Sequence, residues 1–285
     1  MKYALFLGCT IPYRLPFLEA STRKVLSKLD VETVDLPFGC CPDPIGIQSI
    51  DKISYLALAA RNLCIAEEAG LDIITICNGC FETLKVANAE LKENRELRET
   101  VNSFLADIDK EFKGSSAVKH LHQVFYEDIG PKKISSIVST PLTLKLATHY
   151  GCHLLRPEKI LHVDNPDRPR SLDELVEALG AETVDYSEKN LCCGAGVRGI
   201  NAQNSYAIAR AKLADIKRFG AEGLVVTCPT CFLQYDSGQL IVQKEFKENY
   251  QLPVYFYSEL AALALGIAPA EIGLNMHRIK LPALT

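Results

Sequence analysis

Residues 73–80 read IITICNGC, a short β-branched run that leads directly into a C-x-x-C motif. Residues 224–231, LVVTCPTC, repeat this pattern in the second half of the chain. Apolar runs of this length are typical of buried strands, and a motif that recurs at a long spacing indicates an internal repeat. The sequence therefore predicts a duplicated chain, in which each half has a strand that ends at a C-x-x-C motif.

Ten of the eleven cysteines divide into two matching sets, each with a single cysteine, an adjacent pair and a C-x-x-C motif. We name them the first set (Cys9, Cys40, Cys41, Cys77 and Cys80) and the second set (Cys152, Cys192, Cys193, Cys228 and Cys231). The single cysteine and the pair are separated by 30 residues in the first set and by 39 in the second, and the pair and the C-x-x-C motif by 35 and by 34. One net insertion of nine residues after Cys152 therefore relates the halves. Cys64 falls outside both sets, on the apolar stripe of an expected helix, and is predicted to be a buried core thiol.

The rest of the chain alternates strand-like and helical segments, which is typical of an α/β fold with parallel strands. Strands are expected at 3–7, 31–36, 73–76 and 123–126 in the first half, and at 144–147, 182–186, 224–227 and 253–257 in the second. Helices are expected at 17–29, 53–69, 172–179, 207–219 and 258–265. We therefore predict two duplicated Rossmann-like halves, each a small mostly parallel sheet flanked by helices, with domains at 1–140 and 141–285.

The composition excludes several classes of protein. With 48% hydrophobic and 23% charged residues, the chain has an ordinary globular composition. Its net charge of -4 and its scattered lysines and arginines do not suit a nucleic-acid partner. The richest apolar stretch, 260–267, has only eight residues and is too short to span a membrane, and the N-terminus lacks the features of a signal peptide. We expect a cytoplasmic protein, whose eleven cysteines indicate metal or redox chemistry because disulfides rarely persist in that compartment.

In the predicted topology each set lies at the carboxyl ends of three strands, the edge at which open α/β sheets bind ligands. Five thiols far apart in the sequence can therefore meet at one point. Thiolates suit zinc, copper(I) and iron–sulfur clusters, but a tetrahedral zinc site or a cubane cluster needs only four of them. Five per set favours an extended polynuclear cluster, while zinc at both sites, or disulfide and dithiol chemistry alone, remain as simpler alternatives.

Residues 194–199, GAGVRG, match the G-x-G-x-x-G fingerprint of dinucleotide-binding folds. The context does not fit, because two cysteines come directly before the motif and no acidic residue ends a strand about 20 positions later. We therefore expect no nicotinamide or flavin here. The glycines are expected instead to let backbone amides approach the sulfurs.

These motifs together resemble the CCG-domain family, most closely its heterodisulfide reductase B subunits. The resemblance covers both cysteine sets, residues 150–157 (YGCHLLRP) and residues 192–196 (CCGAG); the first set departs from the pattern, because Pro42 follows its cysteine pair. The resemblance implies that each half binds a noncubane [4Fe-4S] cluster through all five of its cysteines. It also implies reduction of a mixed disulfide to two thiols, in methanogens the disulfide of coenzyme M and coenzyme B.

The resemblance further implies that electrons arrive from other proteins: the ferredoxin-type C subunit of heterodisulfide reductase, its flavoprotein A subunit, and a hydrogenase or formate dehydrogenase. A substrate with anionic groups needs cations, and Arg14, Arg156 and Arg198 lie close in sequence to the cysteines. His153 is a candidate proton donor. For each of these four residues an ordinary solvated or paired side chain is the alternative.

Two other functions stay open. The chain could be an electron-relay subunit of another CCG-domain oxidoreductase, of the lactate, glycolate or thiol:fumarate reductase type. It could also be a zinc-bearing scaffold that does no chemistry.

Overall fold

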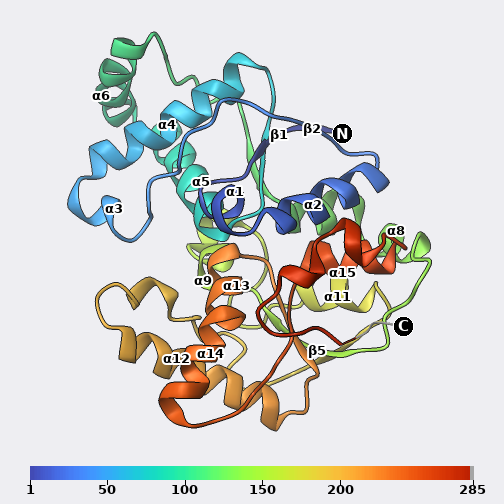
Figure 1. The fold of residues 1–285 in the computed structure, drawn as a ribbon. Coiled ribbons are helices and arrows are strands. Elements are labelled where there is room, and N and C mark those ends of the chain that lie inside the picture. The colour runs from blue at the N-terminus through green and yellow to red at the C-terminus, as the bar shows by residue number, and fades with distance from the viewer. Residues whose placement is uncertain (283–285) are drawn as a thin grey trace.

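The computed structural model describes residues 1–282, which form two four-stranded sheets, one in each half (Figure 1). The strand orders are β2-β1-β3-β4 and β6-β5-β7-β8, and every pairing is parallel. The strands are β1 (Lys2–Phe6), β2 (Glu32–Val34), β3 (Ile73–Thr75), β4 (Val118–His120), β5 (Lys145–His149), β6 (Glu182–Val184), β7 (Gly223–Val226) and β8 (Val254–Phe256). The predicted fold class, two duplicated α/β halves, is confirmed.

The register of the strands repeats between the halves. Lys2 of β1 pairs with Glu32 of β2, and Lys145 of β5 pairs with Glu182 of β6 in the same way. The pairing of β1 with β3 has the same register as the pairing of β5 with β7. The repeat aligns Phe6 at the end of β1 with His149 at the end of β5, an alignment that matters for the site described below.

Helices cover the sheets, and the two longest have the same capping. Asp51 accepts hydrogen bonds from the first turn of α4, and Asn201 does the same for α12. The helices of the first half are α1 (Thr10–Arg14), α2 (Pro16–Lys28), α3 (Ile47–Ile50), α4 (Lys52–Glu68), α5 (Asn78–Glu93), α6 (Arg95–Leu105), α7 (Leu121–Gln123) and α8 (Pro131–Ser136). Those of the second half are α9 (Cys152–Leu155), α10 (Glu158–Leu161), α11 (Ser171–Glu177), α12 (Ala202–Arg218), α13 (Pro229–Tyr235), α14 (Ser237–Phe246) and α15 (Tyr257–Ala264).

One predicted strand is wrong. Residues 123–126 are helical, and the fourth strand of the first half is β4, which ends at His120. The reason is a capping box: the His120 ring accepts from the His122 N–H at 3.0 Å, and the Gln123 side chain accepts from the His120 N–H at 3.3 Å. This box turns the chain into a helix before the apolar run reaches Val124.

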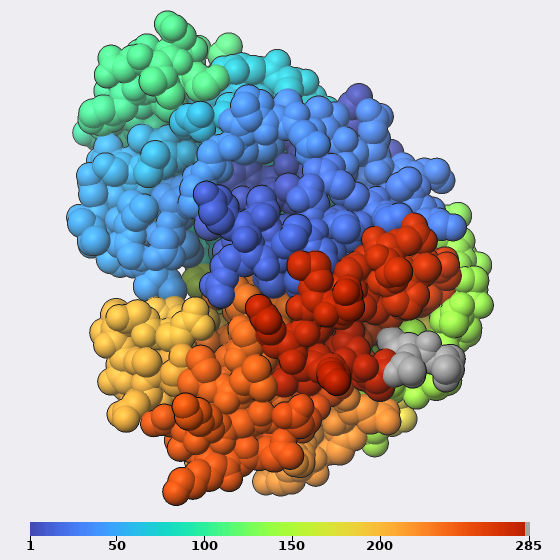
Figure 2. All heavy atoms as spheres, viewed as in Figure 1, coloured from blue at the N-terminus to red at the C-terminus, as the bar shows by residue number. Residues whose placement is uncertain are grey.

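The two halves interlock through their helices. Helix α15, red in Figure 1, lies beside α2, blue, from the opposite half. At this contact the Ser258 hydroxyl is 2.8 Å from that of Ser21 and accepts from Thr22 at 3.1 Å, and all three side chains are fully buried. The space-filling view shows the red and blue segments meeting over a continuous surface (Figure 2). The exact domain limits, 1–140 and 141–285, stay a prediction.

None of the helices within residues 1–282 is both long and apolar enough to cross a membrane.

Candidate metal centres

The first set of cysteines lies at the carboxyl edge of its sheet. Cys9 follows β1, the Cys40–Cys41 pair lies in the loop after β2, and Cys77 and Cys80 flank the start of α5, after β3. All five line one cavity of about 630 Å³, and the Sγ atoms of Cys41 and Cys80 are 2.9 Å apart. Pro229 and Thr230, from the C-x-x-C motif of the other half, line the same cavity.

The second set gathers in the same way. The Sγ atoms of Cys152 and Cys192 are 3.9 Å apart, and those of Cys193 and Cys231 lie within 4.8 Å of each other. The backbone N–H of Gly194 donates to Cys192 at 3.4 Å, and that of Ala195 donates to Cys193 at 3.5 Å. The amides after this cysteine pair thus approach the sulfurs, as expected from the glycine-rich sequence.

Two glycines are required for this close packing. Gly8 and Gly151 lie just before the first cysteine of each set, with φ of +68° and +78°, a backbone conformation that favours glycine. A Cβ at Gly8 would be 2.8 Å from the Cys80 sulfur, and one at Gly151 would be 2.6 Å from the Asn78 side chain. A larger residue at either position would push the neighbouring side chains out of place.

The crowded thiols suit a bound cation. The hydrogen bond from Cys41 raises the pKa of Cys80 well above its usual value, and the bond with Cys193 does the same for the pKa of Cys231. Cys77 of the first set also contacts Cys228 of the second. The hydrogen bond between their thiols is the main cause of the raised pKa of Cys77. Because thiolate is the form that binds metal, such neighbours ionise together only when a positive centre compensates their charge. The residues present therefore fit a thiolate-bound metal group at each set.

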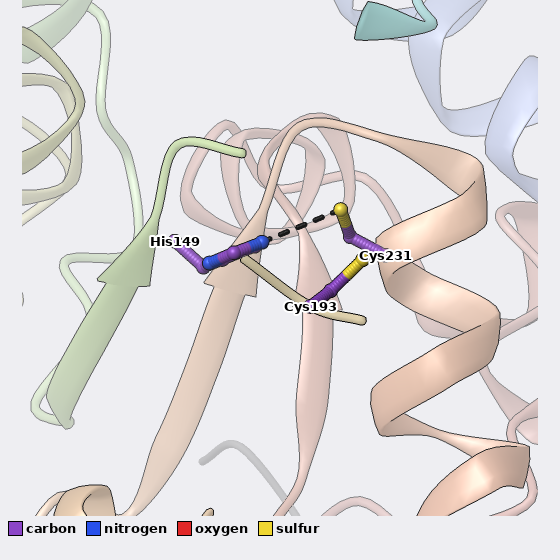
Figure 3. Close-up of side chains that lie close together, drawn as sticks. All are labelled: His149, Cys193 and Cys231. Atoms are coloured by element: carbon purple, nitrogen blue, oxygen red, sulfur yellow. Dashed lines mark hydrogen bonds between the residues drawn. The ribbon is translucent and has the colours of Figure 1, made fainter. Parts of the chain in front are cut away.

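A histidine that the sequence did not single out lies in the second set. His149 Nε2 is 3.3 Å from the Cys231 sulfur, and Cys193 lies beside them (Figure 3). On its other side, Nδ1 is 2.9 Å from the Lys212 amine, which also donates to the Lys189 carbonyl at 2.9 Å. Burial, with Lys212 alongside, keeps the pKa of His149 well below its usual value.

The first half has different residues at the corresponding positions. Phe6 replaces His149 and packs on Phe38 with ring centroids 5.0 Å apart. Asn62 occupies the position in α4 that Lys212 occupies in α12. Its side chain accepts from the Gly39 N–H at 2.8 Å and donates to the Cys40 carbonyl at 3.3 Å. Asn62 and Lys212 thus both hold the loop before a cysteine pair, but only the second half adds a histidine to the sulfurs.

The basic residues predicted from sequence lie apart from the cavity. Arg14 is exposed at the end of α1, Arg156 donates to the Pro166 carbonyl at 3.0 Å, and Arg198 donates to Gln234 at 3.4 Å. The described residues that line the 630 Å³ cavity include none of these three arginines, so their binding role stays a prediction.

His153 forms an ion pair between the halves. Burial disfavours its charged form, but its hydrogen bond to Glu82, from the opposite half, raises its pKa. A role as proton donor to a substrate stays a prediction. Cys64 is buried on α4, as expected.

The cavity has charged residues of its own that sequence reasoning missed. Arg61 on α4 and Asp43 in the loop after the cysteine pair both line it. Arg61 lies close to Gly39, since a Cβ there would be 2.9 Å from the guanidinium. Arg61 is 20 residues beyond Cys41, so no spacing rule connects it with the set.

Comparison with known proteins gives consistent results. The cysteine-rich domain called CCG matches at residues 3–85 and 146–236, once in each half. The chain is 45% identical over 282 residues to the B subunit of the "Ferredoxin/F(420)H(2)-dependent CoB-CoM heterodisulfide reductase" of Methanosarcina acetivorans, covering 98% of this chain and 94% of the relative. It is 32% identical over 279 residues to the "8-methylmenaquinol:fumarate reductase membrane anchor subunit" of Wolinella succinogenes, covering 98% and 97%.

A solved structure is also similar. The crystal structure of a hypothetical protein from Helicobacter pylori superimposes with a TM-score of 0.78 at 19% identity. The superposition covers 99% of this chain and 52% of that one, so the present chain spans about half of that protein. It supports the fold alone.

Proposed function

We propose, because this chain belongs to the CCG family and within it to the heterodisulfide reductase B subunits, that it reduces a mixed disulfide to two thiols using two iron–sulfur clusters. The first set would hold one noncubane [4Fe-4S] cluster and the second set the other, each through all five cysteines. The observation that carries the proposal is the gathering of each set at one sheet edge, with one thiol more than a cubane cluster or a zinc ion requires.

The reaction needs two electrons and two protons for each disulfide bond broken. An iron–sulfur cluster usually supplies one electron at a time, so two clusters match the demand. The chain itself supplies the binding site. A cavity of about 630 Å³ is within the usual range for small ligands. The cluster of the first set would take the part next to its five cysteines, and the lining also includes Pro229 and Thr230 from the C-x-x-C motif of the second set.

The cavity lining holds a carboxylate, Asp43, and a cation, Arg61, which could bind an anionic group of the substrate. Arg61 places a cation in the lining, and a guanidinium can bind a carboxylate, phosphate or sulfonate through two parallel hydrogen bonds. The coenzyme M–coenzyme B disulfide carries such groups. Arg14, Arg156 and Arg198 remain as candidates for a substrate arm that extends beyond the cavity.

The electrons would come from partner proteins of the same complex. We propose the ferredoxin-type C subunit of heterodisulfide reductase as the immediate donor, with the flavoprotein A subunit and a hydrogenase or formate dehydrogenase further along the chain of transfer. The name of the relative from Methanosarcina acetivorans, which includes ferredoxin, supports a donor of this kind.

The relative from Wolinella succinogenes favours a second candidate, an electron-relay subunit of a fumarate reductase. In that case the clusters would pass electrons to another protein of the complex, and the isolated chain would not reduce disulfides.

One experiment separates these functions. The chain is purified without oxygen, analysed for iron, sulfide and zinc, and assayed with reduced methyl viologen and the coenzyme M–coenzyme B disulfide. We expect about eight iron and about eight sulfide per chain, as two [4Fe-4S] clusters require, and disulfide-dependent oxidation of the viologen. Full iron without disulfide reduction would favour the relay, and about two zinc without iron would favour a scaffold.

A further inference from the structure

We propose that His149, oriented by Lys212, donates a hydrogen bond to the Cys231 sulfur and makes the cluster of the second set easier to reduce than that of the first. This inference rests on the proposed function, because it assumes that both sets hold clusters. His149 is a positioning residue here, since it acts on the metal group through a cysteine.

The hydrogen-bond partners decide which nitrogen of His149 carries the proton. The Lys212 amine donates to the Lys189 carbonyl at 2.9 Å and lies 2.9 Å from His149 Nδ1. Burial lowers the pKa of Lys212 to about 7, whereas negative charge on the nearby cysteine sulfurs favours the ammonium form. A lysine ammonium is a donor only, so in that form Nδ1 accepts and the neutral ring keeps its proton on Nε2. That Nε2–H lies 3.3 Å from the Cys231 sulfur and donates to it (Figure 3). His149 could ligate a metal through Nε2 only by losing this proton.

Such a hydrogen bond changes the reduction potential. Reduction adds negative charge to a cluster, and N–H donors to its sulfurs stabilise the more negative form. His149 is 1% exposed and Lys212 is fully buried, so water does not weaken their effect on the sulfur. A buried amine nearby acts in the same direction as the N–H donor.

The first set does not have these donors at the equivalent positions. Phe6 stands where His149 stands, and a phenyl ring cannot donate an N–H bond to a sulfur. Pro42 stands two residues after Cys40, where Gly194 stands two after Cys192, and proline has no backbone N–H. The second half therefore has the more strongly hydrogen-bonded sulfurs.

The difference gives the halves separate tasks. An electron that enters the chain is more stable at the second set, whereas the described residues that line the cavity include all five cysteines of the first set and none of the second. The first electron is thus held away from the cavity, and the second completes the pair that the disulfide needs.

The test measures cluster potentials in His149→Phe, which copies the residue of the first half. Anaerobic redox titrations followed by electron paramagnetic resonance would give the potential of each site, and the Cys41→Ser variant, which keeps the second site, assigns the two signals. We expect the second-site reduction equilibrium to fall about tenfold, or about 59 mV for a one-electron couple, while the first site is unchanged. Phe6→Leu is the matched control and should leave the second site unaffected.

Two further variants separate the hydrogen bond from packing. His149→Gln keeps a side-chain N–H and should restore part of the lost potential, whereas Lys212→Met removes the partner of Nδ1 and should lower the potential with His149 still present. If His149→Phe loses iron, the comparison of Lys212→Met with wild type decides instead. Unchanged second-site potentials in the iron-loaded variants would overturn the inference.

Pulsed electron paramagnetic resonance with ¹⁵N-histidine gives a readout that packing does not affect. We expect a weak nitrogen coupling and an exchangeable proton at the second site, as for a hydrogen bond to sulfur. A strong coupling would mean that His149 ligates iron, and would also overturn the inference. A wild-type chain without iron would instead contradict the proposed function.

Discussion

The two cysteine sets lie at equivalent edges of their sheets but have different surroundings. The first set lines a cavity of about 630 Å³, whereas Cys152 of the second lines a hollow of only about 10 Å³. The second set has His149 and the amides of Gly194 and Ala195 against its sulfurs, where the first has Phe6 and Pro42. The duplicated strands thus fix where the sulfurs meet. The residues around the sulfurs decide whether a ligand can reach the set and, on our proposal, the reduction potential of the cluster it holds.

The test with the largest expected effect removes one sulfur from one set at a time. Cys41→Ser and Cys193→Ser should each lower disulfide reduction at least about 100-fold, since loss of a ligand exceeds the effect of losing its supporting contacts. Iron should fall to about half of the wild-type content, because each variant retains one complete set. Viologen-linked turnover and iron analysis check this.

Cys64→Ser is the matched control, because Cys64 is buried outside both sets. It should keep full iron and turnover, with a loss of about 1–2 kcal/mol in the free energy of unfolding from the buried hydroxyl. Wild-type turnover in either Cys41→Ser or Cys193→Ser would break the idea that both halves are needed.

A smaller effect tests which half receives the substrate. Arg61→Met should raise the Michaelis constant for an anionic disulfide about tenfold, the effect of losing a charge-assisted hydrogen bond of roughly 1.5 kcal/mol. Arg156→Met, in the second half, should change it less than about twofold, because Arg156 already donates to a carbonyl. Steady-state kinetics on the iron-loaded variants would check this, and the reverse order of effects would place the substrate at the second half.

The variant with the smallest expected effect makes the first set more like the second. Pro42→Ala supplies an N–H two residues after Cys40, as Gly194 does for Cys192. The reduction equilibrium of the first site should rise roughly threefold. This is less than the change expected for His149→Phe, because the donor is added next to Cys40, which is exposed, whereas Cys231 is buried. Redox titration measures it. Pro44→Ala, which changes another proline of the cavity lining, should leave the potential as it was.

Much of the fold followed from the sequence because its pattern is local. The β-branched runs before Cys77 and Cys228 and the alternation of strands with helices indicated two parallel sheets, and the structure has them. The strand predicted at 123–126 was wrong because its apolar residues suit a helix equally well. The deciding signal was the His120–Gln123 capping box, a hydrogen-bond pattern that apolar periodicity does not register.

Part of the candidate site was also predictable from the sequence. Spacing alone grouped the cysteines, because the carboxyl ends of parallel strands meet at one edge. His149 could have been found by aligning β1 with β5, which sets a histidine opposite Phe6. Arg61 could not, because its place beside the cavity depends on how α4 packs against the loop at Gly39.

The contact between α2 and α15 has a consequence for biosynthesis. Phe17, Leu18 and Val25 of α2 are buried, but α15, which lies against α2, belongs to the opposite half and is synthesised much later than α2. A nascent chain therefore carries an uncovered apolar surface on its N-terminal half until α15 has been synthesised. Chaperone binding to α2 during this interval, and metal insertion only after α15 has packed against α2, would be the natural order of maturation.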